Sequence, residues 1–325
     1  MLASARVQPL ADLLVVDLSR YLPGAFAARE LRRLGARVVR VEPPGGDPLR
    51  AVAPAWHGAL AEGTESVVAD LRADPALARA LCARADVVLE GFRPGVATRL
   101  GVGPDDLPER VVYCSITGFG AGGRHAARAG HDLNYLGWAG ALADVAPALP
   151  PLPVADLAAG ALGAVVRVLA ALLARERTGR GARLVVSMTH GSHDLVAFRL
   201  GGDPRPRLLT GGLACYRVYR CADGRFLTLA ALEPRFFARF CELAGRPELA
   251  ARQGDEDQEA LAAELAAVVA ARPLADWLAL CEDEDVCVGP VWTLQEAAAE
   301  LGSEASGGAP AAGEHTAAWR AELGL

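Results

Sequence analysis

The chain has 325 residues, of which 52% are hydrophobic and 22% are charged, so it is long enough for a large buried core and more than one compact unit. Its formal net charge of −6 provides no global positive field, which argues against nucleic acid as a partner. The seven cysteines are odd in number, widely scattered and without a C-x-x-C pair, which argues against a disulfide framework. We therefore expect a reduced, cytoplasmic protein.

The sequence predicts neither a signal peptide nor a membrane span. The first 19 residues lack a charged segment followed by a long apolar one. The longest apolar stretch, residues 158–174, carries Arg167 and is shorter than a membrane-spanning helix. We expect it to be a buried or half-buried helix, with no membrane involved.

The first half of the chain alternates β-branched segments with segments of helical periodicity. The predicted strands span residues 13–19, 36–43, 66–70, 86–92, 110–117 and 183–188. The predicted helices span residues 24–35, 74–85 and 157–176. In the second of these helices, Asp74 is the expected N-cap and Pro75 a first-turn residue. The repetition of strand, helix and strand predicts an α/β fold whose parallel sheet is covered on both faces.

The composition changes after about residue 190, which indicates a second domain. The Pro- and Gly-rich stretch of residues 201–212 is typical of a linker. Beyond it, a hairpin is expected around Asp223 and Gly224, and helical segments follow at residues 234–245, 257–273 and 274–286. We therefore predict a large α/β domain of residues 1–195 plus 300–325, a linker of residues 196–209 and a small α+β domain of residues 210–295.

A histidine lies at a predicted helix entrance, in the segment GHDLNYLGWAGAL of residues 130–142. Asp132 is the expected cap of this helix, and its packing residues would be Leu133, Leu136, Trp138 and Leu142. His131 is then either a polar residue tolerated at the entrance or a catalytic base held there by the turn.

Two carboxylates also stand where helices are expected to begin. Asp156 follows the proline-rich PPLPVA at an N-cap position, and the small residues LAAG after it would let a ligand approach the backbone. A cap is the structural explanation, and the alternative is a carboxylate beside amide groups that also favour a developing oxyanion. Glu233 lies between a strand end and Pro234, where an exposed glutamate is the ordinary expectation. Taken alone, neither carboxylate marks a site.

Two further motifs are weak. GFGAGG at residues 118–123 matches G-x-G-x-x-G, but it follows the fifth predicted strand and has no acidic ribose partner downstream, so it is better interpreted as a glycine-rich turn. His190 and His193 have a spacing that would suit a metal ion, but the sequence suggests no third ligand nearby, so no metal site is predicted.

A series of ordered motifs runs from about residue 10 to the C-terminus. They are LLVVDLSRYLPGAFAARELRRLGARVVRVEPPGGDPLR, ADVVLEGFRPGVATRLGVGPDDL, RVVYCSITGFGAGG, AGHDLNYLGWAGAL, RERTGRGARLVVSM, YRCADGRFLTLAALEPRFF and GEHTAAWRAELGL. Together they resemble the class III CoA-transferase family, which includes the α-methylacyl-CoA racemases. The resemblance implies a Rossmann-like large domain to which the final helix returns, a small α+β domain and an interlocked homodimer.

The family supports two reactions, and the resemblance implies residues for each. In the CoA-transferases an aspartate, here Asp156, is a nucleophile that forms acyl anhydride and CoA thioester intermediates. In the racemases a histidine and an aspartate, here His131 and Asp156, face the substrate α-carbon from opposite sides, and Glu233 would orient the histidine. The chain carries this histidine and reads LAALEP where the transferases have a glycine-rich loop. The resemblance therefore favours a racemase or epimerase of 2-methylacyl-CoA thioesters, with no cofactor beyond the CoA moiety of the substrate.

The CoA contacts implied by the resemblance are Arg72, Phe92, Arg93, Arg99 and Asp132. The segment EGFRPGVATRLG matches the loop that holds the adenine and phosphate end, and Asp132 is expected on the pantetheine arm. The chain departs from the family at residues 61–66, where AEGTES replaces a basic N-R-G-K-R-S and is expected to remove positive charge from a phosphate-facing strand entrance. The segments at residues 190–210 and 292–312 are also shorter than usual. A CoA-transferase and a non-catalytic CoA-binding homologue are the alternatives.

Overall fold

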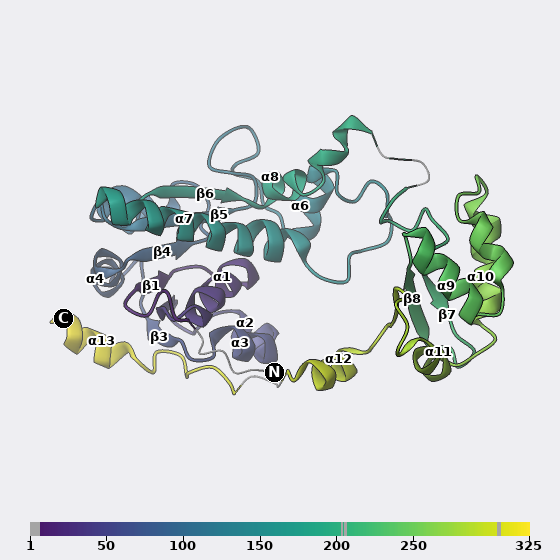
Figure 1. Cartoon of the computed structure of the whole chain (residues 1–325). Helices are drawn as coiled ribbons and strands as arrows, with labels where there is room; N and C mark the ends of the chain where they lie inside the picture. Colours follow the sequence, from purple (N-terminus) through teal and green to yellow (C-terminus); the bar gives the residue numbers. More distant parts are fainter. Residues whose placement is uncertain (1–6, 203, 205–206, 304–306) are drawn as a thin grey trace. The chain divides into compact units, whose positions relative to one another are not determined.

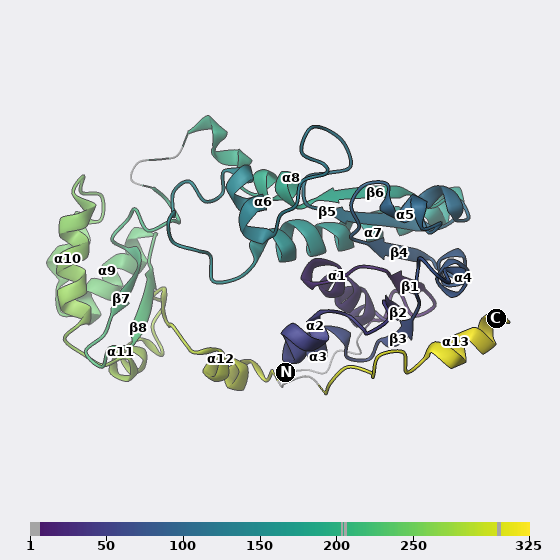
Figure 2. The ribbon, with the colours of Figure 1, turned by 180° about the vertical axis from the view of Figure 1, so that it is seen from behind.

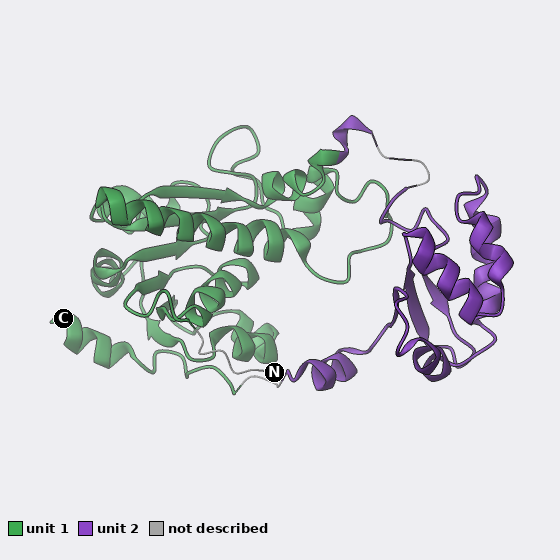
Figure 3. Ribbon diagram, viewed as in Figure 1, with its two compact units in different colours: residues 1–198, 305–325 green, residues 199–304 purple. Residues whose placement is uncertain are grey.

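The computed structural model describes residues 7–202, 204, 207–303 and 307–325, and the chain forms two compact units (Figures 1 and 3). Unit 1 contains residues 1–198 and 305–325, and unit 2 contains residues 199–304. The first boundary lies inside the expected linker, of which residues 203, 205 and 206 lie outside the described residues. Each unit has a hydrophobic core of its own.

Unit 1 is built on a six-stranded parallel sheet. Its strands are β1 (Leu14–Asp17), β2 (Arg37–Glu42), β3 (Glu65–Val68), β4 (Val87–Glu90), β5 (Val112–Thr117) and β6 (Arg183–Ser187). The order is β3-β2-β1-β4-β5-β6, and every neighbouring pair is parallel. The central strands β1 and β4 are buried along their whole length, as expected where both faces of a parallel sheet are covered.

Helices cover both faces of this sheet (Figures 1 and 2). The helical segments of unit 1 are α1 (Leu22–Arg33), α2 (Leu49–Val52), α3 (Pro54–Ala61), α4 (Ala76–Arg84), α5 (Val96–Arg99), η1 (Pro104–Asp106), α6 (Asp132–Ala139), η2 (Ala155–Leu162), α7 (Gly163–Thr178), α8 (Met188–Asp194) and α13 (Thr316–Leu323). Helices α1 and α7 contribute to the core on one face, and α4 and α13 contribute to the core on the other. The predicted α/β fold of the large domain is confirmed.

The predicted start of α4 was wrong in detail. The helix begins at Ala76, and Pro75 is its N-cap residue rather than a first-turn residue. Asp74 still helps the helix entrance, because its Oδ1 accepts a hydrogen bond from the amide of Ala76 at 3.3 Å.

The segments η2 and α7 form one helical stretch, Ala155–Thr178, whose most apolar part has a mean hydropathy of 2.2. By length and composition alone it is long enough to cross a membrane, which the sequence pattern did not predict. One side is buried in the core of unit 1 at Ala155, Ala164 and Val168. Packing in the core therefore explains the apolar residues on that side of the helical stretch.

The C-terminal segment covers the edge strand β3, and Figure 1 shows α13 as the last element of the chain. The amide of His315 donates to Ser66 O at 2.9 Å, and Thr316 Oγ1 accepts from the amide of Val68 at 3.0 Å. Trp319 is 1% exposed, and its Nε1 donates to Glu65 Oε2 at 2.7 Å. The segment thus satisfies backbone groups that an edge strand would otherwise leave open to another chain.

Unit 2 combines a small antiparallel sheet with helices. The strands β7 (Tyr216–Arg220) and β8 (Phe226–Ala230) form the hairpin predicted around Asp223 and Gly224. A third strand, β9 (Val288–Pro290), pairs with β8 and was not predicted, because three residues including Gly and Pro carry no strand periodicity. The remaining segments are η3 (Ala197–Gly201), which crosses the boundary between the units, α9 (Pro234–Leu243), η4 (Pro247–Arg252), α10 (Gln258–Val269), α11 (Leu274–Cys281) and α12 (Leu294–Leu301). The predicted α+β class of the small domain is confirmed.

All seven cysteines of the chain lie in the described residues, and all are free thiols. The prediction that they form no disulfide framework is therefore confirmed.

Candidate active site

Two neighbouring cavities lie in unit 1 at the carboxyl ends of the parallel strands, where open α/β sheets bind their ligands. The arginine cavity has a volume of about 780 Å³ and lies beyond β1, β2, β3 and β4. The histidine cavity has a volume of about 510 Å³ and lies beyond β1, β4 and β5. The two share the wall residues Arg20, Tyr21, Gly91, Phe92 and Arg93.

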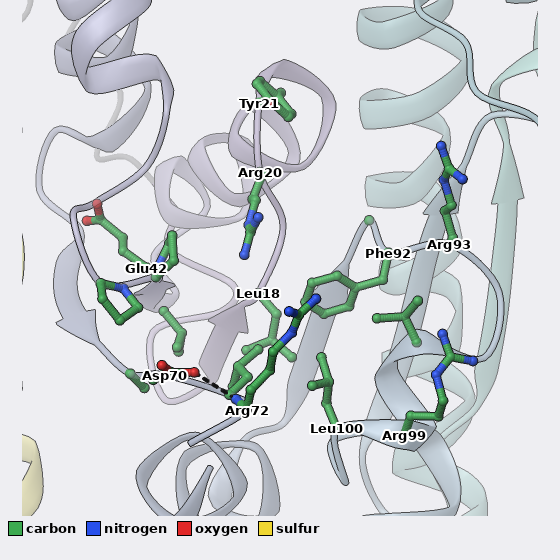
Figure 4. A pocket seen from close by; sticks show the side chains of 17 residues that line it. Leu18, Arg20, Tyr21, Glu42, Asp70, Arg72, Phe92, Arg93, Arg99 and Leu100 are labelled. Carbon is green, nitrogen blue, oxygen red and sulfur yellow. Dashed lines mark hydrogen bonds between the residues drawn. The ribbon is translucent and has the colours of Figure 1, made fainter. Parts of the chain in front are cut away.

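Four arginines line the arginine cavity (Figure 4). They are Arg72, Arg93 and Arg99, which the sequence predicted, and Arg20, which it did not. Among the described residues, none of the four forms an ion pair with a carboxylate. Phe92, also predicted, adds an aromatic face to the same wall. A cavity with this lining is suited to phosphate groups carried on a planar base.

The carboxylates in the same wall already have partners within the protein. Asp70 Oδ1 accepts hydrogen bonds from the amides of Arg72 and Ala73 at 2.9 and 3.1 Å. Glu42 pairs with Arg50 at 2.6 Å. Burial by itself would raise the pKa of Glu42, but the hydrogen bonds to the carboxylate outweigh it and lower the pKa to about 2. In the described part of the chain, neither carboxylate forms an ion pair with one of the four arginines.

A buried ion pair supports the loop after β2 that forms one side of the arginine cavity. Arg40 is 2% exposed, and its Nη2 lies 2.7 Å from Asp47 Oδ2. The amide of Asp47 donates to Glu42 Oε2 at 2.7 Å, which closes the loop over Gly45 and Gly46. Both glycines have φ near +90°, a conformation that favours glycine. The motif VRVEPPGGDP thus builds the cavity wall from the inside.

The shared wall is anchored by a second buried carboxyl group. Glu90, at the end of β4, is 5% exposed, and its Oε2 accepts a hydrogen bond from the amide of Phe92 at 2.6 Å. Burial raises the pKa of Glu90, while the contacts with Ser115 and the Phe92 amide oppose the rise. This bond holds the backbone that presents Phe92 and Arg93 to the ligand space.

The histidine cavity brings His131 and Asp156 together, as predicted. Both line it, together with Asn134, Tyr135 and Met188. Its volume lies within the range of cavities that bind small molecules. Arg128 also lines it, with its Cζ 5.3 Å from the ring centroid of Trp138.

His131 is the N-cap residue of α6, so the prediction that Asp132 caps this helix was wrong. Asn134 Oδ1 accepts a hydrogen bond from the amide of His131 at 3.0 Å and so fixes the backbone at the helix entrance. The ring of His131 is exposed to the cavity rather than packed in the core. The turn thus holds a histidine that is accessible to a ligand.

The predicted packing of α6 was correct only in part. Leu136 is buried, but Leu133 and Trp138 are 46% and 50% exposed, and Tyr135 and Ala139 are buried in their place. The helix is only eight residues long and ends at Gly140, so its buried face is narrow.

Asp156 lies in the first turn of the π-helix η2, whose N-cap is Val154, so the predicted N-cap position of Asp156 was wrong by two residues. The amide of Asp156 donates to Asp132 Oδ1 at 2.9 Å, which ties the starts of η2 and α6 together. Burial raises the pKa of Asp156 to about 7, and the nearby charge of Asp132 adds to the rise. Short π-helical segments and carboxyl groups titrating near neutrality are both frequent at functional sites.

The two other predicted site residues, Asp132 and Glu233, line neither cavity. Asp132 accepts the Asp156 amide and is absent from the described lining of both cavities, so its predicted contact with the pantetheine arm stays a prediction. Glu233 is the exposed N-cap residue of α9 in unit 2, directly before Pro234, as the sequence indicated. Its role as the partner of His131 stays a prediction.

The segment AEGTES of residues 61–66 lies at the amino end of β3 and lines neither cavity. Its predicted effect on phosphate binding stays a prediction. Glu65 pairs with Arg37 at 2.6 Å and accepts the Trp319 Nε1 hydrogen bond. The acidic segment therefore binds the C-terminal helix.

The two weak motifs have structural roles. GFGAGG forms a turn after β5, and no helix follows it before α6, so it is not a dinucleotide motif. His190 Nδ1 lies 2.7 Å from Ser187 Oγ, and His193 Nδ1 lies 3.0 Å from Ala139 O. Across the described ranges, no group of three or more metal-binding side chains is present.

The site therefore combines an anion-binding cavity with a second cavity that contains a histidine and a protonatable carboxyl group. Such a pair can move a proton on a bound carbon acid, or the carboxylate can attack an acyl group. The first-turn amide groups of α6 lie at the positive end of that helix, where a negative charge is favoured.

Comparisons with known proteins show the family of this chain. The sequence profile of CoA-transferase family III matches residues 10–316. The chain is 36% identical over 309 residues to the human alpha-methylacyl-CoA racemase, covering 88% of this chain and 78% of that protein. It is 33% identical over 323 residues to the acetyl-CoA:oxalate CoA-transferase of Acetobacter aceti, covering 89% and 82%. A crystal structure of a CAIB/BAIF family protein from Brucella suis superposes with a TM-score of 0.83 and 29% identity, over 97% of this chain and 99% of that one. The chain therefore belongs to CoA-transferase family III.

Proposed function

We propose that this enzyme is a racemase or epimerase of 2-methylacyl-CoA thioesters. The observation that carries the proposal is the pairing, in one cavity, of an accessible histidine with an aspartate whose pKa lies at about 7. A proton donor and acceptor works best when its pKa is near the working pH, whereas a carboxylate nucleophile works best fully ionised. The similarity to a racemase supports the same assignment.

In the proposed reaction, neutral His131 removes the α-proton of the thioester, and the electron pair of the C–H bond moves to the carbonyl oxygen. The resulting enolate oxygen is stabilised by the amide groups at the start of α6. Protonated Asp156 then donates its proton to the opposite face of the α-carbon, which inverts the centre. The reverse direction exchanges the two roles, and no cofactor beyond the CoA moiety is needed.

The arginine cavity is proposed to bind the nucleotide end of CoA. Arg72, Arg93 and Arg99 would neutralise its phosphates, and Phe92 would contact its adenine. The shared wall then leads the arm of CoA from the arginine cavity into the histidine cavity. The family resemblance further implies an interlocked homodimer, and the exposed apolar residues of α7, Val166 and Leu173, offer a surface for a second copy. We place the reaction in the cytoplasm, where free thiols persist.

The test is deuterium incorporation from heavy water into the α-position of a chiral 2-methylacyl-CoA, with loss of optical purity. We expect both to occur at the same rate for either epimer. If the protein binds CoA but the thioester gains no α-deuterium, the proposal is contradicted.

The alternative reaction is CoA transfer through Asp156, which the similarity to an acetyl-CoA:oxalate CoA-transferase favours. Incubation with an acyl-CoA and a carboxylate acceptor, followed by hydroxylamine, would then modify Asp156. A modified Asp156 without α-deuterium would assign the transferase. Binding of CoA without either reaction would assign a non-catalytic homologue.

The pH dependence of α-deuterium exchange is expected to follow the ionisation of Asp156. For the epimer whose α-hydrogen faces this residue, the reaction needs ionised Asp156 as the base and protonated His131 as the acid, so kcat/KM follows a bell-shaped pH profile. Its rise with increasing pH follows the ionisation of Asp156, at about 7. The change Asp132→Asn removes a negative charge that raises the pKa of Asp156, so the rise should move to lower pH. The side-chain oxygen of the new asparagine can still accept the hydrogen bond from the Asp156 amide. A rise that stays in place or moves to higher pH in this variant would contradict the assignment.

A further inference from the structure

Tyr21 has the most unusual backbone conformation near the site. Its φ is 67° and its ψ is −164°, a combination that is essentially confined to glycine. In the described residues, the other non-glycine residue with positive φ is Leu209. A residue other than glycine persists in such a conformation only where the surrounding chain imposes it.

The chain on both sides of Tyr21 is held firmly. The amide of Leu18 donates to Leu89 O at 2.8 Å, and the amide of Ser19 donates to Asp17 Oδ1 at 2.8 Å. On the other side, α1 begins at Leu22 and Pro23 lies in its first turn. These contacts fix both ends of the turn between β1 and α1. The strained φ and ψ angles of the turn are those of Tyr21.

Packing within the protein does not account for a tyrosine at this position. The side chain is 51% exposed. Within the described part of the chain, its hydroxyl makes no hydrogen bond and its ring stacks on no other ring. A glycine would adopt the same backbone without strain, so the ring must contribute something other than protein stability.

The position of the side chain indicates what the ring contacts. Tyr21 lines both cavities and belongs to the wall that they share. In Figure 4, Arg20 extends toward the part of the cavity that contains Phe92, while Tyr21 lies on the other side of the same turn. The strained backbone thus directs two consecutive side chains to different parts of the ligand path.

We propose that Tyr21 is a substrate-binding residue that contacts the arm of an acyl-CoA where it passes from the arginine cavity to the histidine cavity. This inference rests on the proposed function, because it takes an acyl-CoA as the ligand. The arm carries amide groups and short apolar segments, for which an aromatic ring with a free hydroxyl is a suitable surface.

The test compares Tyr21→Gly with Leu209→Gly in the full-length protein. Both remove a side chain from a residue with positive φ, but Leu209 belongs to unit 2 and lines neither cavity. Both variants are expected to raise the melting temperature by about 2–4 °C. Tyr21→Gly alone is expected to raise the KM for 2-methylbutanoyl-CoA and the Kd for free CoA about tenfold, with kcat within about threefold of wild type. Tyr21→Phe should give an intermediate KM, because it keeps the ring and loses the hydroxyl.

The outcomes separate this inference from the proposed function. Wild-type KM and Kd in Tyr21→Gly would overturn the role of Tyr21 even if the wild type exchanges α-deuterium. A weaker Kd in Tyr21→Gly, when the wild type binds CoA without exchange, would support Tyr21 and contradict the racemase. A wild type that binds no CoA would overturn both. A melting temperature that falls in Tyr21→Gly would show that the ring stabilises the fold instead, and would also overturn the inference.

Discussion

Replacement of His131 with alanine is expected to lower the racemisation rate by about 10²–10⁴-fold, the range that a positioned acid–base group contributes. His131 lines the histidine cavity and is exposed at the start of α6, so its ring supports no core packing. The affinity for free CoA should therefore stay within about threefold of wild type. Asp156→Asn is expected to lower the rate by a similar factor, because a single remaining group cannot both remove and return the proton.

The assay is α-deuterium uptake from heavy water, with Kd for CoA measured on the same samples. His190→Ala is a matched control, because His190 bonds to Ser187 and lines neither cavity. The variants His131→Ala and Asp156→Asn together also distinguish the two reactions of the family. A CoA-transferase would lose activity in Asp156→Asn and keep most of it in His131→Ala. Racemisation that survives in His131→Ala would contradict the proposed mechanism.

Replacement of Trp319 with alanine is expected to lower the free energy of unfolding by about 3–5 kcal/mol, the usual cost of removing a large buried aromatic side chain. The ring is 1% exposed, the Arg37 Cζ lies 4.2 Å from its centroid, and Nε1 donates to Glu65. Its loss would leave a cavity against α4 and loosen the segment that covers β3. We therefore expect faster hydrogen exchange at Ser66 and Val68 and a stronger tendency to aggregate through the exposed edge.

Denaturant unfolding measures the change, and Leu325→Ala is the control. Leu325 is 51% exposed at the end of the chain, so its replacement should alter stability by less than about 0.5 kcal/mol. The loss of stability in Trp319→Phe should lie between those in Leu325→Ala and Trp319→Ala, because phenylalanine fills most of the space but cannot donate the hydrogen bond to Glu65. A change below about 1 kcal/mol in Trp319→Ala would show that α13 contributes little to the fold.

Much of the architecture could be predicted from local patterns. The short β-branched segments became β1 to β6, the Asp223–Gly224 turn became the β7–β8 hairpin, and the long apolar stretch became η2 and α7. These features depend on residues close together in the chain, through side-chain periodicity and turn chemistry. Short helices such as α2 and α5, and the strand β9, were not predicted, because three or four residues carry no measurable period.

The sequence by itself determined the fold class and, through its ordered motifs, the family and the identity of His131 and Asp156 as candidates. The tertiary structure decided how these residues are used. The order β3-β2-β1-β4-β5-β6 brings Arg20 beside Phe92, more than seventy positions away in the chain, and a hydrogen bond joins Asp156 to Asp132. Burial and the charge of Asp132 together move the pKa of Asp156 to about 7, and neither can be read from neighbouring residues. Local periodicity specifies which segments are strands and helices, whereas charge, burial and the meeting of distant loops arise only when the strands are placed side by side.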